Sequence, residues 1–552
     1  MNNYIKLGLL GALIGIAALK PELASTQWRR LEKTLSRFAQ RRLVCCLTMG
    51  ALVLVVRLCL LPIWDPPKPY IYDEFGYLLQ ADTFTSGRLT NPTPALWQFF
   101  ESPYLLMQPS YTSKYPPGQG FVLAAGQLLF HDPWFGVWLS CGLLMAVLCW
   151  AMQGWLSPGW ALFGSFLALK LCLFSYWMDS YWGGALAAIG GALMLGAIPR
   201  IIDEGRWVYS WLLGLGAVLL ALTRMYEGLL FVIPILLTLV LKRARFKVWL
   251  LSGAIAALGG AFVLYYNLQV TGHATELPYI AHQRQYGYAP YFSFQGLQPE
   301  TQYRHENLFN LSHGWEFQRW QESRSLQLFR ARGKDWYTSL SNICGGTFTV
   351  VVLCLLFLPA WRQRKWLLPF ACVCLVVAGS LVETIFYTHY AAPATVAILL
   401  LTVCTFQQLR YSRFGGPHMG RFLSRGVPAA AFLLLMGTEG VRLYKHEPVQ
   451  ATKPVNARKQ ILEDQLREQK GGKHLILVRY TKEKVPHEEW IYNRADIEAS
   501  DMVWAHDMGP VENAKIIEHF KGRMYWLMKP DDNPDLFEPY TEITPTAPPM
   551  SQ

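Results

Sequence analysis

Long uninterrupted apolar runs constrain the fold of this chain more than any other feature. Apolar stretches of about 15 to 22 residues recur along most of the sequence, and a bilayer core needs about 20 apolar residues per helix. Of the 552 residues, 52% are hydrophobic and only 16% are charged, whereas soluble domains average about 25% charged residues. A membrane barrel would show short strands of alternating polarity instead. The pattern predicts a polytopic helical membrane protein.

The apolar runs predict eleven membrane spans, or twelve if residues 5–19 also cross. The predicted spans cover residues 43–63, 134–153, 160–178, 182–199, 208–223, 229–241, 248–268, 343–360, 366–382, 391–408 and 427–444. We place the basic stretch 29–42 in the cytoplasm and assign the successive connections between spans to alternate sides of the membrane. Every strongly basic connection then falls on the cytoplasmic side, where Lys and Arg are enriched. The net charge of +12 is therefore an orientation signal, and we expect no binding to nucleic acid.

The sequence divides into three predicted parts. Residues 1–42 hold an apolar segment and a basic amphipathic cytoplasmic helix, and residues 43–444 form a transmembrane domain with external loops 64–133 and 270–342. The tail, 445–552, has three short strand patterns, "KHLILVRY", "DMVWAHD" and "MYWLMK", with a helix pattern, "PVENAKIIEHFKG", between the last two. A small α/β domain outside the membrane is expected there. The eleven cysteines lie in or beside the apolar runs and show no disulfide or zinc spacing.

Ionisable residues gather on the predicted outer side. The first outer loop begins with "YIYDEFGYLLQ" and returns with "SYTSKYPPGQG". Asp73 is either the N-cap of an amphipathic helix or a carboxylate for chemistry, and Glu74 beside it would complement the helix dipole. Lys114 is either a snorkelling lysine before a helix-starting proline pair or a cation that meets an anionic lipid. Such groups in membrane segments are functional candidates by default.

Further candidates stand at other predicted outer ends. Arg224 in "LTRMYEG" either forms a helix-end ion pair with Glu227 or faces a phosphate, which its planar fork suits. Asp179 lies among aromatic residues in "YWMDSYWGG" and is either a turn residue or part of a site. Arg57, inside the first long span, either pairs with a carboxylate of the bundle or snorkels outward.

These motifs, in this order, resemble a known family. An Asp-Glu pair in the first outer loop, an amphipathic helix with "SGRL" and then "KYPPG" are similar to the polyprenyl-phosphate-sugar-dependent GT-C glycosyltransferases. The branches that they resemble are bacterial relatives of the dolichyl-phosphate-mannose protein mannosyltransferases and the lipid A aminoarabinose transferases. The resemblance spans roughly residues 43–410. It implies an all-α polytopic fold of GT-C type, with about 11–12 transmembrane helices and, in this chain, a small C-terminal extracytoplasmic α/β domain.

The resemblance also implies roles for individual residues. Asp73 matches the catalytic acid/base group, with Glu74 as its companion, and Lys114 and Arg224 match cations that bind the donor phosphate. Candidates for the donor or acceptor site are Tyr72, Tyr115, Asp179, Glu227, His389 and Tyr390, the last two from "THYAAP". Phe75 and Gly76 stand where some relatives have an arginine, and no MIR-like repeat is present.

The expected activity is transfer of a sugar from a polyprenyl-phosphate donor to a hydroxyl of a glycan, glycolipid or protein. It would take place at the extracytoplasmic face of the inner (plasma) membrane. One carboxylate opposite one leaving phosphate implies inversion, because a retaining route needs a second carboxylate as nucleophile. No cofactor and no metal are expected.

Two other functions stay open at this point. One is a glycolipid transporter or flippase, although transporters usually carry their ionisable sites near the midplane. The other is a non-catalytic cell-envelope assembly protein. The aromatic stretch "HQRQYGYAPYFSFQG" suits carbohydrate contact and an interfacial lid equally.

Overall fold

The computed structural model describes residues 3–69, 71–347, 349–351, 363–412, 418–445, 454–469, 472–480 and 489–541. The chain divides into two compact units. The first comprises residues 1–66, 134–263 and 322–450, and the second comprises residues 67–133, 264–321 and 451–552. The second unit combines the first predicted outer loop with most of the second one and of the tail, whereas residues 322–342 belong to the first unit. The predicted domain boundaries remain predictions.

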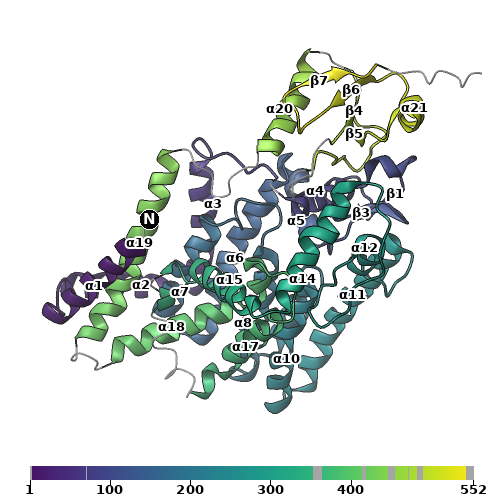
Figure 1. Ribbon diagram of the computed structural model, residues 1–552. Coiled ribbons are helices and arrows are strands. Elements are labelled where there is room, and N and C mark those ends of the chain that lie inside the picture. Colours follow the sequence, from purple (N-terminus) through teal and green to yellow (C-terminus); the bar gives the residue numbers. More distant parts are fainter. Residues whose placement is uncertain are drawn as a thin grey trace, which may run out of the picture. The chain divides into compact units, whose positions relative to one another are not determined.

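The first unit is a bundle of helices (Figure 1). Its helices are α1 (Asn3–Leu19), α2 (Ser25–Gln40), α3 (Arg42–Leu60), α6 (Trp134–Trp155), α7 (Pro158–Leu173), α8 (Ala185–Ile202), η2 (Trp207–Tyr209), α9 (Ser210–Ala221), α10 (Met225–Leu241), the first part of α11 (Phe246–Thr271), α15 (Gln327–Ile343), η5 (Arg364–Trp366), α17 (Leu367–Ser380), η6 (Thr388–Ala394), α18 (Thr395–Tyr411) and α19 (Met419–Tyr444).

The apolar runs do form helices, and the protein is a polytopic helical membrane protein. In the described part of the chain, six helices are long and apolar enough to cross a membrane: α3, α6, α8, α11, η6 with α18, and α19. Each corresponds to a predicted span. The predicted spans 160–178, 208–223 and 229–241 correspond to the shorter apolar helices α7, α9 and α10. The predicted span 343–360 falls largely outside the described residues, so the total of eleven or twelve remains a prediction.

Small residues let the helices of this unit approach closely. A Cβ atom added at Gly191 of α8 would lie 2.0 Å from the carbonyl oxygen of Pro393. Only glycine therefore permits the contact between α8 and η6, which is the segment that carries His389 and Tyr390. Close packing at small residues is a common way for membrane helices to associate.

The second unit contains a four-stranded sheet built from the tail. Its strands are β4 (His474–Val478), β5 (Met502–His506), β6 (Met524–Met528) and β7 (Phe537–Pro539), in the order β5-β4-β6-β7. β4 is parallel to both of its neighbours, and β7 is antiparallel to β6. The helix α21 (Pro510–His519) connects β5 to β6. The three predicted strands and the predicted helix are confirmed, whereas the sequence interpretation missed β7 and the helix α20 (Pro454–Gln469).

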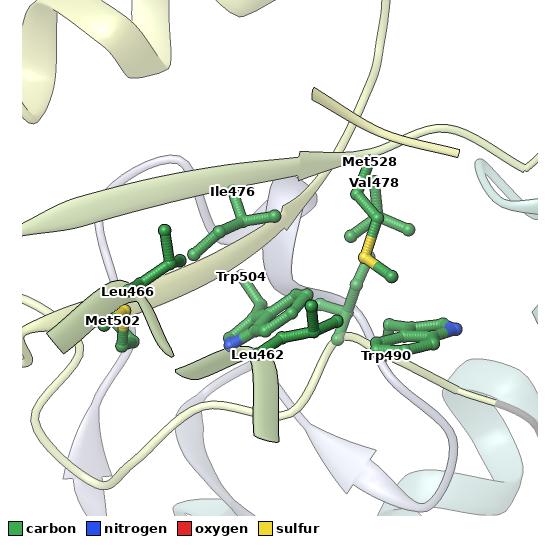
Figure 2. Packing of buried hydrophobic residues seen from close by; sticks show 9 residues of the cluster. Leu462, Leu466, Ile476, Val478, Trp490, Met502, Trp504 and Met528 are labelled. Atoms are coloured by element: carbon green, nitrogen blue, oxygen red, sulfur yellow. The ribbon is translucent and has the colours of Figure 1, made fainter. Parts of the chain in front are cut away.

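One face of the sheet packs against α20. Leu462 and Leu466 of α20 form a buried cluster with Trp504, and further members are Ile476, Val478, Trp490, Ile491, Met502 and Met528. Figure 2 shows Leu462 beside the indole ring of Trp504. All five residues of β4 are buried, which fits a central parallel strand covered on both faces.

The remaining elements of the second unit come from the two predicted outer loops. They are α4 (Tyr72–Thr85), β1 (Asn91–Pro92), η1 (Trp97–Phe100), β2 (Leu105–Leu106), β3 (Ser110–Ser113), α5 (Gly118–Phe130), α12 (Pro278–Tyr286), α13 (Glu306–Phe309), the π-helix η3 (Asn310–Glu316) and α14 (Phe317–Ser323). The predicted amphipathic helix after Asp73 is α4. The apolar helix α5 follows the proline pair for which a helix-starting role was one alternative, and it was not among the predicted spans.

We expect Leu462→Ala to destabilise the protein, because it removes a buried side chain from the contact between α20 and the sheet. Leu-to-Ala changes in cores typically cost about 2–5 kcal/mol, and Leu462 is only 4% exposed. The adjacent Ile461 is 55% exposed, so Ile461→Ala is a matched control with little expected effect. Thermal unfolding of the purified protein in detergent measures both. Equal losses for the two variants would contradict this packing.

Candidate functional site

Asp73 lies in the first turn of α4 with its carboxylate partly accessible. The helix begins at Tyr72, and Ile71 occupies the N-cap position, so Asp73 is not the N-cap. Its Oδ1 accepts a hydrogen bond of 2.5 Å from the hydroxyl of Tyr115. Tyr115 is buried and Asp73 is half-buried. A carboxylate near a helix N-terminus is also stabilised by the helix dipole. Asp73 is therefore a carboxyl group that is held in position and that solvent and ligand can still reach.

Glu74 has a structural contact at the same helix end. Its Oε2 accepts the backbone N–H of Ile71 at 3.1 Å, which satisfies a donor that the start of a helix leaves without an intrahelical partner. The side chain is almost fully buried. Glu74 thus caps the start of α4. A catalytic role for Glu74 remains a prediction.

A close approach of two segments brings Tyr115 to Asp73. A Cβ atom added at Gly76 would lie 2.7 Å from Ser113 Oγ and 3.2 Å from the ring of Tyr115. Glycine at this position thus allows α4 to pack against the chain that leaves β3.

Lys114 is buried inside a group of tyrosine rings. Its Nζ lies 3.4 Å from the ring centroid of Tyr104, and the rings of Tyr115, Tyr279 and Tyr291 lie 5.6, 5.8 and 5.7 Å away. An ammonium over an aromatic face is attracted by the ring quadrupole. The side chain of Lys114 is 5% exposed, so it is not a snorkelling lysine. Pro116 and Pro117 do precede α5, as the helix-starting alternative expected.

Two carboxylates offset the charge of the buried lysine. Burial lowers the pKa of Lys114 to about 8, while the negative charges of Glu316 and Asp73 act in the opposite direction. Burial raises the pKa of Glu316, and the charge of Lys114 opposes that rise. Glu316 ends the π-helix η3, and π-helical turns occur frequently at functional sites. Asp73, Lys114 and Glu316 therefore form one charged cluster within the second unit.

The backbone is strained at the residue whose ring lies nearest to the Lys114 ammonium. Tyr104 has a φ of 65°, a left-handed conformation that costs a bulky residue free energy. Its carbonyl accepts the backbone N–H of Lys114 at 3.1 Å, so both the backbone and the ring of Tyr104 contact Lys114. We interpret the strain as the consequence of placing this ring against the ammonium.

Tyr72, the first residue of α4, belongs to the second unit, and the other predicted residues lie in the first unit. Arg224 occupies the N-cap position of α10, and its guanidinium lies 4.2 Å from the ring centroid of Tyr390. The Nδ1 atom of His389 lies 2.9 Å from the hydroxyl oxygen of Tyr176, within hydrogen-bond distance. Arg224 thus lies close to Tyr390, the neighbour of His389 in the chain, and the role of these residues in donor binding remains a prediction.

Two buried carboxylates accompany Arg224. Glu227 lies in the first turn of α10 rather than in the predicted loop, and it is buried. Burial and the negative charge of Glu227 raise the pKa of Glu383, whereas the charges of Arg332 and Arg224 lower it. Arg332 fixes the loop of Glu383 by donating to the carbonyl oxygens of Ser380 and Glu383 at 2.7 and 2.5 Å.

Asp179 forms an internal ion pair. Its Oδ1 accepts a hydrogen bond from Arg57 Nη2 at 3.2 Å, and the two side chains are 3% and 0% exposed. The Arg57 guanidinium also donates to the carbonyl oxygen of Trp64 at 2.9 Å and lies over the rings of Trp64 and Trp134. Burial raises the pKa of Asp179 to about 7 despite this partner. Arg57 thus pairs with a carboxylate of the bundle, one of its two predicted alternatives.

Sequence reasoning missed four members of the Lys114 cluster, namely Tyr104, Tyr279, Tyr291 and Glu316. Tyr291 belongs to the aromatic stretch for which carbohydrate contact and an interfacial lid were expected equally. In the structure its ring is one of the four tyrosine rings around the Lys114 ammonium. No spacing in the sequence links Glu316 to Lys114. Among the described residues no group of three or more His, Cys, Asp or Glu side chains is arranged to hold a metal ion, and independence from metal remains a prediction.

The pKa of Lys114 generates a testable dependence of stability on pH. A lysine whose folded-state pKa is about 8 rather than the ordinary 10.5 binds fewer protons in the folded than in the unfolded protein between these values. The stability that Lys114 contributes therefore rises with pH in this window. At about 1.36 kcal/mol per pKa unit, the expected gain from Lys114 between pH 7 and pH 9.5 is roughly 2 kcal/mol.

Thermal unfolding of the protein in detergent at pH 7 to 9.5 measures this gain. The window ends below the ordinary pKa of tyrosine, near 10, because tyrosines that are exposed on unfolding ionise there and oppose the effect. Lys114→Met is the control. Lys459, whose pKa burial also lowers to about 8, and cysteines that are exposed on unfolding, with an ordinary pKa near 8.5, titrate in the same window in both proteins. The effect of Lys114 is therefore the difference in slope between the wild type and the variant, and equal slopes would contradict the buried lysine.

We also expect Asp179→Asn to destabilise the protein strongly, because it leaves the guanidinium of Arg57 buried without its counter-charge. Breaking a buried pair in this way costs about 3–5 kcal/mol, whereas replacing both partners by apolar residues is often close to neutral. Thermal unfolding of Asp179→Asn, Arg57→Met and the double variant Arg57→Met/Asp179→Leu tests this. Normal stability with lost activity in Asp179→Asn would argue for a role in substrate binding instead.

Comparison with known proteins gives likenesses at the level of the fold. No protein-family model matches the sequence, and no curated protein matches it. ArnT from Cupriavidus metallidurans in the apo state is similar with a TM-score of 0.46 and 15% identity over 88% of this chain and 94% of that one. Its complex with undecaprenyl phosphate gives a TM-score of 0.45 and 14% identity, and covers 88% of this chain and 93% of that one.

The apo oligosaccharyltransferase of Archaeoglobus fulgidus gives a TM-score of 0.46 and 10% identity over 80% of this chain. This chain covers only 63% of the length of that oligosaccharyltransferase. Both proteins are enzymes of the GT-C type that the sequence motifs resemble. With TM-scores below 0.5 and identities below 25%, no donor, acceptor or residue role is carried over from either protein to this chain.

Proposed function

We propose that the protein is an integral membrane glycosyltransferase that transfers a sugar from a polyprenyl-phosphate donor to an acceptor hydroxyl. The observation that carries the proposal is the half-buried carboxylate of Asp73, held by Tyr115 and close to the buried cation of Lys114. A base that ligand can reach, next to a positive charge, is what attack by a hydroxyl with loss of a phosphate requires. The chain also has the apolar helices that would bring it to a lipid-borne donor.

In the proposed reaction the carboxylate of Asp73 accepts the proton of the acceptor hydroxyl. The acceptor oxygen forms a bond to the anomeric carbon of the sugar, and the bond from that carbon to the phosphate oxygen breaks. The polyprenyl phosphate leaves as an anion. General-base help of this kind contributes about 10²–10⁴ in rate. A base as weak as a carboxylate suffices when proton transfer is late and the sugar carbon has oxocarbenium character in the transition state.

The positive charge of Lys114 would stabilise the phosphate as it leaves. Its pKa of about 8 keeps most of the population charged at neutral pH. In a site with little water a fixed charge acts more strongly than in solution. Arg224 is the second cation that the proposal assigns to the donor phosphate, on the evidence of its sequence motif and of its place with His389 and Tyr390 in the first unit.

The proposal includes inversion at the sugar carbon. Glu316 is the other carboxylate of the Lys114 cluster, and the proposal assigns it to the charge balance of Lys114 and not to attack on the sugar. A direct displacement assisted by Asp73 alone then gives inversion. The proposed setting is the extracytoplasmic face of the inner membrane, because the basic connections are assigned to the cytoplasmic side. The acceptor is a glycan, glycolipid or protein, and no metal or other cofactor is assigned to the reaction.

Asp73→Asn tests the proposal, because the amide keeps the size of the side chain and loses its basicity. We expect sugar transfer to fall by about 10²-fold or more, with the protein still folded. The measurement uses membranes that contain the protein, a panel of radiolabelled polyprenyl-phosphate sugars and the endogenous acceptors. Asp65 is exposed and lies in the same predicted loop, so Asp65→Asn is a matched control that should keep normal transfer.

Other outcomes of this assay would decide against the proposal. Undiminished transfer by Asp73→Asn would exclude Asp73 as the base. If the wild type transferred no sugar and the labelled lipid only changed leaflet, the protein would be a transporter.

A further inference from the structure

The buried hydroxyl of Tyr492, in the segment between β4 and β5, lacks a partner. Tyr492 is 8% exposed, and its Oη atom makes no hydrogen bond to any residue that the structure describes. Burying a hydroxyl without a hydrogen bond costs free energy, and most buried polar groups in proteins avoid it. An unpaired buried group of this kind calls for an explanation, and a ligand that completes the hydrogen bond is one.

The backbone around Tyr492 is held firmly on both sides. The ammonium of the buried Lys459 donates to the carbonyl oxygens of Trp490 and Tyr492 at 2.6 and 2.9 Å. The Asn493 side chain exchanges two hydrogen bonds with the backbone of Trp504, at 2.8 and 2.9 Å. The hydroxyl therefore does not lack a partner because its segment is loose. The segment is fixed and presents this group in one position.

The ring of Tyr492 lies against the helix that carries Asp73. It stacks on Phe75 with 4.1 Å between ring centroids and an angle of 3° between the planes. The ring of Tyr72 lies 6.3 Å away. Phe75 and Tyr72 flank Asp73 in the first turn of α4. The negative charge of Asp73 also contributes to the raised pKa of Tyr492, after burial as the main cause.

The tail and the first outer loop are joined at this point within the second unit. The hydroxyl of Tyr111 donates to the carbonyl oxygen of Asn493 at 3.2 Å, and Asp82 accepts the backbone N–H of Ala495 at 2.8 Å. Ser102 donates to the carbonyl oxygen of Ile491. These contacts fix residues 491–495 against the loop that carries Asp73 and Lys114, so the tail contributes directly to the surroundings of the candidate base.

We propose that Tyr492 is a specificity-determining residue of the Asp73 site, and that its hydroxyl binds a hydroxyl-bearing acceptor. This inference rests on the proposed function. Asp73 accepts the proton of the acceptor in that reaction, and the ring of Tyr492 lies against Tyr72 and Phe75, which flank Asp73 in the sequence. The leaving phosphate is assigned to Lys114, which is linked to Asp73 through Tyr115. A tyrosine hydroxyl both donates and accepts, which matches a saccharide hydroxyl.

Tyr492→Phe tests the inference, because it keeps the ring stacked on Phe75 and removes only the unpaired hydroxyl. The assay uses purified protein, a radiolabelled polyprenyl-phosphate sugar and dilutions of a solubilised membrane extract from cells that lack the protein, as the source of acceptor. We expect the apparent KM for the extract to rise roughly 2- to 12-fold, the range that a net hydrogen bond to a neutral group gives. The KM for the donor should not change.

Stability provides the second readout. Removing an unpaired buried hydroxyl should leave the thermal midpoint unchanged or raise it, whereas the loss of a structural hydrogen bond would lower it. Tyr540→Phe is the matched control, because the hydroxyl of Tyr540 accepts a hydrogen bond from Asn513 at 3.1 Å within the tail. It should leave both KM values unchanged.

The outcomes separate this inference from the proposed function. With an active wild type, an unchanged KM for the extract, a raised KM for the donor, or a lowered thermal midpoint in Tyr492→Phe would each overturn the role of Tyr492 and leave the transferase standing. A wild type that transfers no sugar from any donor would overturn the proposed function, and the role of Tyr492 with it.

Discussion

The burial of Lys114 is the constraint around which the second unit is organised. Removing an ammonium from water costs several kcal/mol in a real protein, and the cost must be offset by counter-charges and well-placed dipoles. Lys114 obtains this from four tyrosine rings and from the charges of Asp73 and Glu316. These groups come from α4, from the chain around β2 and β3, from α12 and the residues after it, and from η3. Segments of both predicted outer loops therefore pack around one buried charge.

The same arrangement explains how Asp73 can be both held and available. The hydroxyl of Tyr115 donates a hydrogen bond to the Asp73 carboxylate, and the side chain of Asp73 is half-buried. The positive charge of Lys114 also acts on this site. The carboxylate is thus fixed at the start of α4 while part of it remains accessible.

The sequence was sufficient for features that depend on local pattern. Apolar length located α3, α6, α8, α11 and α19, and strand and helix patterns located β4, β5, β6 and α21. These predictions rest on neighbouring residues, whose periodicity and composition are visible in one chain. The pattern was less informative for α7, α9 and α10, where the apolar helices are shorter than a full span.

Contacts between distant segments were not predictable in the same way. Asp73 and Lys114 could be singled out, because a charge at a membrane edge is conspicuous by itself. The tyrosines that surround Lys114, and Glu316 at the end of a π-helix, come from positions up to about 200 residues further along the chain, and no spacing rule reaches across such loops. The orphan hydroxyl of Tyr492 is likewise defined by what surrounds it. A single sequence shows that a tyrosine is present and not whether its hydroxyl has a partner.

The environment also separates two carboxylates that the sequence presented as similar candidates. Asp179 is 3% exposed and pairs with Arg57, which is fully buried, at 3.2 Å, so its charge is used to stabilise another charge inside the first unit. Asp73 is half-buried and accepts a hydrogen bond from a neutral group. A carboxylate whose charge offsets a buried cation gains little from meeting a ligand, whereas one that stays partly open can still be reached by a ligand. This difference supports the proposal that Asp73 rather than Asp179 acts as the base.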